Sequence, residues 1–174
     1  MTPDLQAAAW IALVNPKSPT NVGHVMRAAG CFGVNGIFYT GERFNHARKF
    51  ITDTKDHHET IPLTWTEQLL AALPDGAVPV AVELVEGATS LTDYTHPPRA
   101  LYLFGPEDGS LSQDLVNGCR DVIYIPTRGC LNLAASVNIV LYDRLLKSGS
   151  DRPGGDELIR QSRDNNNRLK RQPD

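Results

Sequence analysis

Short apolar runs alternate along the chain with segments in which apolar residues recur every three or four positions. An apolar run of this length predicts a buried strand, and the recurring spacing predicts a helix. The expected strands cover residues 7–14, 34–39, 60–63, 78–84, 100–104 and 121–125. The expected helices begin at Thr20 or Asn21, cover residues 65–73 and 112–119, and begin again at Leu131. This alternation predicts an α/β fold, with a mostly parallel sheet flanked by helices on both faces.

The stretch from Tyr124 to Asp143 connects the last expected strand to the last expected helix of the sheet domain. Pro126 ends the strand because it has no N–H to give to a neighbouring strand. The turn that follows contains Gly129, and the helix has Asn132 near its start. A strand end, a turn and a helix start together leave backbone donors and acceptors free for a ligand. The helix is apolar on nearly all sides, which is typical of a helix buried on more than one side.

The first expected helix has two different faces. One face is apolar and consists of Val22, Val25, Met26, Ala29 and Phe32. The other carries Gly23, Arg27 and Gly30, which share a side because they are four and three residues apart. Flanking glycines let a ligand or another backbone approach Arg27, and the helix N-terminus suits a phosphate. The alternative is a surface arginine in an ion pair, beside glycines that only permit tight packing.

A second candidate for chemistry is the loop over residues 103–112. It leaves an apolar strand through Gly105 and Pro106, at the edge of the sheet where ligands bind in open α/β proteins. Glu107 is an acid in this constrained turn and can accept a hydrogen bond, although a solvated glutamate near a helix start is the alternative. The loop has neither a GxGxxG pattern nor a Walker lysine, so a standard nucleotide phosphate cradle is not supported.

The composition is that of one ordinary globular domain. The chain has 174 residues, of which 41% are hydrophobic, and this is enough to form a core. It shows no apolar run of membrane-spanning length and no N-terminal leader, so we expect a cytoplasmic protein without a membrane partner. Three cysteines without a CxxC pair, and the adjacent His57 and His58, indicate neither a disulfide framework nor a metal site.

The charge is distributed unevenly. A net charge of −3 argues against general nucleic-acid binding through bulk charge. Basic residues nevertheless dominate after residue 158, as Arg160, Arg163, Arg168, Lys170 and Arg171. We expect residues 1–149 to form the domain, and residues 150–174 to form a polar, basic, weakly ordered tail that can contact phosphates. Residues 41–59 are also polar, and we expect a mobile excursion that contains a short helix.

Three stretches, taken in order, resemble the motifs of the SpoU/TrmH-type RNA methyltransferases, a group within the SPOUT class. Asn21, Gly23 and Arg27 match the first motif. The second motif is matched by Gly105, Pro106 and Glu107, with its close altered to Gly109, Ser110 and Leu111. The third motif is matched by Ile125, Pro126, Leu131, Asn132, Tyr142 and Asp143. The resemblance spans about residues 8–147 and includes all three motifs in their order.

The resemblance implies that the C-terminal part of the domain is threaded into a trefoil knot, which the residues alone do not show. It also implies that S-adenosylmethionine binds in the knot, through loops that follow three strands. The cofactor-binding residues carried over in this way are Glu83, Leu84, Gly87, Phe104, Gly105, Pro106, Glu107, Ile125, Pro126, Cys130, Leu131 and Asn132. The family works as a homodimer, in which the first-motif arginine of one subunit, here Arg27, faces the cofactor of the other.

The reaction implied by the resemblance is methyl transfer to a ribose 2′-hydroxyl of RNA, with tRNA preferred over rRNA. The catalytic residues carried over are Asn21, Arg27, Glu107 and Asn132. A hydroxyl is a poor nucleophile unless its proton is removed as it attacks. The family often casts its arginine as the base, but arginine is protonated at any working pH. Arg27 therefore either acts as the base with the help of a nearby RNA phosphate or only orients the substrate, and we favour orientation. Asn21 is expected to hold Arg27 or the ribose.

Two positions depart from the family pattern. Cys130 stands where the third motif has a serine, and Ala134 stands where serine is frequent. A thiol is a weaker hydrogen-bond donor than a hydroxyl, so a serine-dependent contact to substrate is in question. Two other functions therefore remain open. One is a SPOUT enzyme that methylates a base nitrogen, and the other is an RNA-binding module that has lost catalysis.

Overall fold

The computed structural model describes residues 6–48, 61–148, 154–163, 166 and 168–172. The strands are β1 (Ala8–Leu13), β2 (Gly36–Tyr39), β3 (Leu63–Trp65), β4 (Val78–Val82), β5 (Thr89–Ser90), β6 (Arg99–Phe104) and β7 (Asp121–Tyr124). The helices are α1 (Pro19–Cys31), α2 (Arg43–Arg48), the 3-10 helix η2 (Leu91–Asp93), α3 (Gln113–Gly118), α4 (Leu133–Lys147) and α5 (Gly155–Ser162). None of the helices in these ranges has both the length and the apolar character needed to cross a bilayer.

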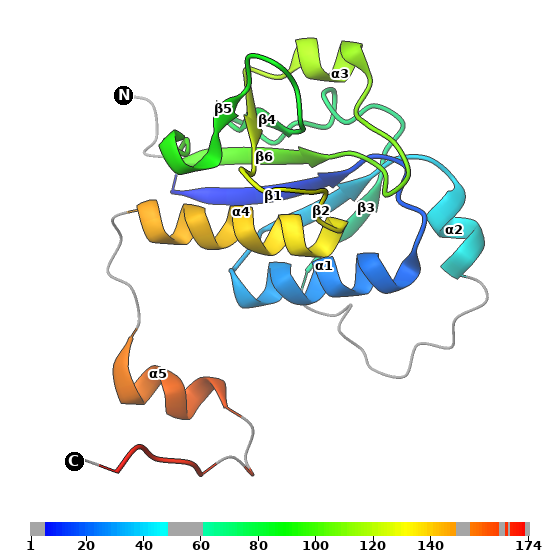
Figure 1. Cartoon of the computed structure of the whole chain (residues 1–174). Coiled ribbons are helices and arrows are strands. Elements are labelled where there is room, and N and C mark those ends of the chain that lie inside the picture. The colour runs from blue at the N-terminus through cyan, green and yellow to red at the C-terminus, as the bar shows by residue number, and fades with distance from the viewer. Residues whose placement is uncertain (1–5, 49–60, 149–153, 164–165, 167, 173–174) are drawn as a thin grey trace.

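The seven strands form one sheet in the order β3-β2-β1-β6-β4-β7-β5, and every pair of neighbours is parallel. This confirms the predicted α/β fold with a mostly parallel sheet. Helices α1 and α4 run side by side along one face, and α3 covers the other (Figure 1). Because the strands are parallel, the loops that follow them all lie at one edge of the sheet, beside the N-terminal ends of α1 and α4.

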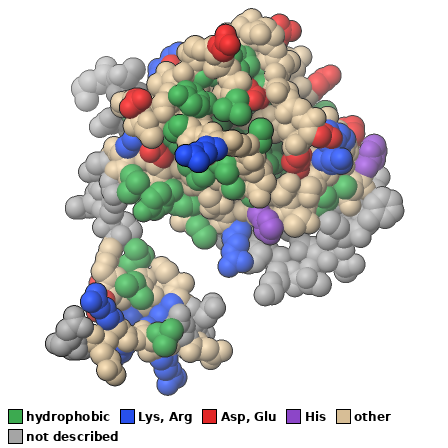
Figure 2. Space-filling view, viewed as in Figure 1, with side chains coloured by type: hydrophobic (Ala, Val, Ile, Leu, Met, Phe, Trp, Pro, Cys, Tyr) green, Lys and Arg blue, Asp and Glu red, His purple; other side chains and the backbone are tan. Residues whose placement is uncertain are grey.

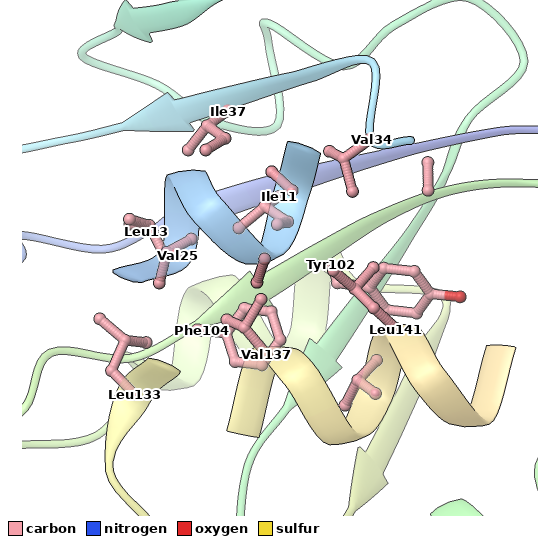
Figure 3. Close-up of a cluster of buried hydrophobic side chains, with 14 of the residues drawn as sticks. Ile11, Leu13, Val25, Val34, Ile37, Tyr102, Phe104, Leu133, Val137 and Leu141 are labelled. Carbon is pink, nitrogen blue, oxygen red and sulfur yellow. The ribbon is translucent and has the colours of Figure 1, made fainter. Parts of the chain in front are cut away.

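The larger core lies between the sheet and helices α1 and α4. Figure 3 shows its side chains converging from both layers: Ile11, Leu13, Tyr102 and Phe104 from the sheet, with Val25, Val137 and Leu141 from the helices. Full burial of an aliphatic side chain contributes about 1.5–3 kcal/mol. A smaller core on the other face contains Leu69, Leu101, Leu103 and Leu111. The central strands are therefore buried on both sides, which explains their continuous apolar runs.

Helix α1 begins earlier than the sequence pattern indicates. Ser18, and not Thr20 or Asn21, is its N-cap, and the Ser18 hydroxyl accepts a hydrogen bond from the Asn21 N–H at 3.3 Å. Pro19 is tolerated in the first turn because its missing N–H has no partner there. The predicted apolar face is confirmed, because Val22, Val25, Met26 and Ala29 are buried. The helix ends before Gly33, whose φ of 65° an ordinary side chain disfavours.

The helix predicted over residues 65–73 is wrong. Trp65 ends β3, which also lies later in the sequence than the strand predicted over residues 60–63. Thr66 then begins a turn, in which its hydroxyl accepts a hydrogen bond from the Gln68 N–H at 3.3 Å. Leu69 is buried against the smaller core, with Leu70 and Leu73 packed beside it. Turns thus bury the apolar positions that the spacing assigned to a helix.

Three elements were not predicted: strand β5, helix η2 and helix α5. Strand β5 and helix η2 are short, and neither shows a clear periodic pattern. Helix α5 lies in the tail that was expected to be weakly ordered, and it stands apart from α4 in Figure 1. The short helix predicted in the polar excursion is present as α2, while residues 49–60 of that excursion lie outside the described residues. The trefoil knot stays a prediction.

Candidate active site

A cavity of about 300 Å³ lies at the carboxyl edge of the sheet, beside the ends of β4, β6 and β7. Its wall includes most of the predicted cofactor-binding residues: Glu83, Leu84, Phe104, Gly105, Pro106, Glu107, Ile125, Cys130, Leu131 and Asn132. Gly87 and Pro126 do not line it, and Pro126 instead lines a groove beside α4. The structure therefore brings together three loops that are far apart in the sequence.

The loop after β6 lies tightly against the loop after β4. The Glu83 carboxylate accepts hydrogen bonds from the N–H of Leu84 at 3.0 Å and of Leu111 at 2.9 Å. A Cβ at Gly105 would lie 3.2 Å from the Leu111 nitrogen and 3.3 Å from the Glu83 carboxylate. A side chain at position 105 would therefore push these groups apart by a few tenths of an ångström. Glu83 thus shapes the cavity wall through backbone contacts.

Glu107 connects the second motif to the first. Its carboxylate accepts hydrogen bonds from the N–H of Lys17 at 2.8 Å and of Ser18 at 3.0 Å, and from Asn21 Nδ2 at 3.2 Å. Partial burial acts to raise the pKa of Glu107, but the backbone donors of Ser18 and Lys17 outweigh it and hold the pKa below 4.5. Glu107 is therefore an ionised anchor for the start of α1.

Asn132 lines the cavity and is the N-cap of α4. Its side-chain oxygen accepts a hydrogen bond from the Ala135 N–H at 2.7 Å, and its backbone carbonyl accepts from the Ser136 N–H at 3.0 Å. This is the capping function that asparagine performs well at a helix N-terminus. Cys130 is exposed in the preceding loop. The loop is shaped by the Thr127 hydroxyl, which donates to the Gly129 carbonyl at 2.7 Å.

Arg27 does not line this cavity. It is exposed on α1 together with Gly23 and Gly30, and a Cβ built on either glycine meets nothing within 4 Å. The side-chain amide of Asn21 donates to Glu107, and no contact between Asn21 and Arg27 is present in the described part of the chain. Of the four predicted catalytic residues, Asn21, Glu107 and Asn132 are thus together, and Arg27 is separate.

The sequence patterns missed one cluster beside the cavity. Asp108 accepts two hydrogen bonds from Arg43 of α2, at 2.9 and 3.0 Å, and lies 3.5 Å from Lys17 Nζ. The Arg43 hydrogen bonds, together with the two positive charges, hold the pKa of Asp108 below 3.8. The two consecutive acids, Glu107 and Asp108, therefore join the loops that follow β1, β2 and β6. The adjacency of the acids was visible in the sequence, but their partners were not.

The fold and the cavity define an α/β protein with a ligand site at the carboxyl edge of its sheet. Residues 8–142 match the model of the SpoU rRNA Methylase family, and the chain belongs to this family. No curated protein matches the chain.

Solved structures share the fold at low sequence identity. The SpoU methyltransferase AviRb from Streptomyces viridochromogenes has a TM-score of 0.65 and 20% identity, over 83% of this chain and 61% of that one. A putative RNA methyltransferase of the TrmH family from Porphyromonas gingivalis has a TM-score of 0.68 and 19% identity, over 80% and 60%. A structure that addresses 2-OH methylation of C/U34 on tRNA has a TM-score of 0.66 and 24% identity, over 82% and 97%. The chain thus spans about 60% of the length of the first two.

Proposed function

We propose that this chain is an S-adenosylmethionine-dependent RNA methyltransferase that acts on ribose 2′-hydroxyls, with tRNA preferred over rRNA. The observation that carries the proposal is the cavity in which the loops of all three motifs meet, with Glu107 bonded to the start of α1. Two similar structures point the same way. AviRb has been solved in complex with AdoMet, and the structure with 24% identity concerns 2-OH methylation of tRNA.

The cavity suits S-adenosylmethionine in size and chemistry. A volume of about 300 Å³ is at the lower end of the range for small-molecule sites. Leu84, Ile125 and Leu131 offer apolar surface for a purine ring, while the turns around Gly105 and Gly129 offer backbone groups for the polar parts. The bound cofactor would supply the methyl group on its sulfonium. Glu83, Glu107 and Asn132 would hold the three loops around it.

The attacking ribose hydroxyl has to lose its proton as it forms the new bond to carbon. Arg27 is a guanidinium that stays protonated, so we assign it to orienting the ribose and the neighbouring phosphate. The Asn21 amide, fixed by Glu107, lies in the cavity wall where the substrate would enter. In this assignment the proton is released to solvent water as the methyl group leaves the sulfonium, which becomes a thioether.

The separation of Arg27 from the cavity of its own chain supports a homodimer, in which Arg27 serves the partner's cavity. The surface that would pair is the outer face of α4. Ile139 is 37% exposed and Tyr142 is 54% exposed, and both line an apolar groove of about 530 Å³. Figure 2 shows hydrophobic side chains gathered over this helix. An apolar face of this kind marks an interaction site.

The first test is calorimetric titration with S-adenosylmethionine and S-adenosylhomocysteine, followed by transfer of a labelled methyl group to unfractionated tRNA and to rRNA. We expect one binding site per subunit and more label on tRNA. A 2′-O-methyl group blocks the hydroxyl that attacks the phosphate in alkali, so ribose methylation leaves the label in dinucleotides. Label in mononucleotides would indicate base methylation. If the protein binds RNA but binds no cofactor, whether the cofactor is titrated with or without RNA, it is a module that has lost catalysis.

A further inference from the structure

We propose that Trp65 is a stacking platform for a base of the RNA substrate that flanks the methylated nucleotide. This inference rests on the proposed function, and it assigns a binding site to a residue outside the three motifs. It is carried by the exposure of Trp65, by the way its ring is held, and by its place in the register of the sheet.

Trp65 leaves a large aromatic surface in water. It ends the edge strand β3 and is 46% exposed. Tryptophan normally contributes to stability by burying most of its ring. The chain's other tryptophan, Trp10, is half-buried, and the Arg99 guanidinium lies over its ring at 4.8 Å. The Trp10 ring is therefore partly buried and covered by a cation, whereas much of the Trp65 ring is available.

The Trp65 ring is held in place by the backbone. Its indole N–H donates to the Gly41 carbonyl at 3.3 Å. Gly41 has a φ of 75°, and a Cβ at that position would collide with the Asn15 side chain. The Gly41 backbone, whose carbonyl orients the indole, is therefore itself confined by the Asn15 side chain. Since the only polar group of the side chain is already used, the exposed part of Trp65 is an apolar ring with a fixed orientation.

The register of the sheet places Trp65 in one row of paired residues with Phe104, a residue of the cavity wall. Trp65 pairs with Tyr39, and Tyr39 pairs with Leu13. Leu13 pairs with Phe104, which lines the cavity. Neighbouring strands lie about 4.8 Å apart, so three steps place the Trp65 backbone roughly 14 Å from that of Phe104. A short segment of single-stranded RNA along this edge reaches both.

The charges along this edge favour stacking over simple phosphate attraction. Lys17 lies in the loop after β1, which is one of the two inner strands of the row, and its side chain is 64% exposed. Glu42 and Glu67 are exposed in the loops after β2 and β3, and Asp108 pairs with Arg43 and Lys17. This mixed edge, on a chain of net charge −3, gives little bulk attraction for phosphate. Base–aromatic stacking does not depend on charge and tolerates any base.

The experiment compares Trp65→Ala, Trp65→Phe and Lys17→Gln with the wild type in binding of unfractionated tRNA over a series of salt concentrations. We expect Trp65→Ala to weaken binding by about 10-fold with an unchanged salt slope, because stacking releases no counterions. Trp65→Phe should restore most of the affinity. Lys17→Gln should instead reduce the slope by about one. In a Trp10→Phe background, tRNA should quench the emission of Trp65.

Cofactor titration and gel filtration of each variant separate the outcomes. Unchanged S-adenosylmethionine affinity in Trp65→Ala shows that the variant is folded. If the wild type methylates tRNA and Trp65→Ala binds it equally well, the stacking role is overturned while the proposed function stands. If the wild type binds no cofactor but tRNA still quenches Trp65, the proposed function fails and the stacking site stands. A change of oligomeric state in Trp65→Ala would make Trp65 a subunit contact and overturn the proposal.

Discussion

Glu107 shows how a single residue can link a motif to the fold. Its three hydrogen bonds join the loop after β6 to the start of α1, across about 90 positions of sequence. The donors are two backbone N–H groups and one amide, so the acceptor has to be an anion with both oxygens available. A glutamine would present its own N–H₂ group to one of these donors. The structural role of Glu107 is therefore sensitive to its ionisation.

We expect the stability of the protein to depend on the ionisation of Glu107 in acid. Because its pKa is lower in the folded chain than 4.5, the ionised carboxylate stabilises the fold above pH 4.5. This contribution is lost as the pH falls through the lowered pKa. Glu107→Gln should therefore have a lower melting temperature than the wild type at pH 7, and the difference should shrink towards pH 3. Thermal unfolding across this range measures it, and a difference that is independent of pH would contradict it.

Arg27 is the residue whose proposed role depends on a second subunit. We expect Arg27→Ala to lower turnover by on the order of 100-fold or more, as removal of a charge-stabilising donor does in other enzymes. S-adenosylmethionine affinity should stay nearly intact, because Arg27 is assigned to the substrate. Arg27→Lys should recover little, since an ammonium lacks the planar fork of a guanidinium. A large loss of cofactor affinity in calorimetry would overturn the assignment.

At the scale of elements, α4 is fastened at both ends. Asn132 caps its N-terminus in the cavity wall. At the other end, Arg144 donates to the carbonyls of Pro97 at 2.7 Å and Pro98 at 2.6 Å, and to the Tyr102 hydroxyl at 3.2 Å. These bonds hold the helix to the segment that enters β6. The position of the Asn132 loop therefore depends on contacts a whole helix away.

A histidine with only 4% of its side chain exposed completes this attachment. His96 lies between the Tyr102 hydroxyl, at 2.6 Å from Nδ1, and the Asp143 carboxylate, at 2.8 Å from Nε2. A neutral ring that accepts from Tyr102 and donates to Asp143 satisfies every partner. Burial lowers the pKa of His96 below 6.5, although the contact with Asp143 opposes this. Burial also raises the pKa of Tyr102 to about 12.

We expect Arg144→Ala to lower the free energy of unfolding by about 2–3 kcal/mol, because it removes charged hydrogen bonds and leaves carbonyls without a donor. The matched control is Arg160→Ala on the exposed face of α5, which should change it by less than about 0.5 kcal/mol. Urea denaturation followed by circular dichroism measures both. Equal midpoints for the two variants would show that this end of α4 is held by packing alone.

At the scale of the whole molecule, the apolar outer face of α4 would be covered by a second copy. We expect Ile139→Glu to convert a dimer into a monomer, because it introduces a charge into a desolvated surface. Ile159→Glu is the matched control, since Ile159 is 56% exposed on α5 rather than on α4. Sedimentation or light scattering gives the masses. A wild-type monomer, or a dimer that survives Ile139→Glu, would contradict this interface.

The division into a domain over residues 1–149 and a basic tail over residues 150–174 is a proposal with its own test. We expect deletion of the chain after residue 150 to weaken tRNA binding and to flatten its dependence on salt, because the tail's arginines and lysine would no longer displace counterions. S-adenosylmethionine affinity should not change. An affinity for tRNA that matches the full chain at every salt concentration would remove the tail from RNA binding.

The sequence by itself determined the features that local periodicity encodes. The alternation of strands and helices, the buried face of α1 and the positions of the three motifs all follow from which neighbouring residues are apolar, and the structure agrees with them. Predictions from local pattern were wrong where contacts with distant parts of the chain determine the local structure. The apolar spacing of residues 65–73 fits a helix, but Leu69 reaches the core through turns. Strand β5 has only two residues, which is too short for a pattern of its own.

Only the tertiary structure decided which residues meet. Strand order and register come from contacts between segments that are far apart in the sequence. No local pattern of residues in one sequence encodes these contacts. They bring Glu107 to the N–H of Lys17 and Ser18, leave Arg27 outside the cavity, and align Trp65 with Phe104 across four strands. The motifs thus identified the family from sequence, while the neighbours of each motif residue, and the exposed ring at the end of the row, depended on how the sheet assembles.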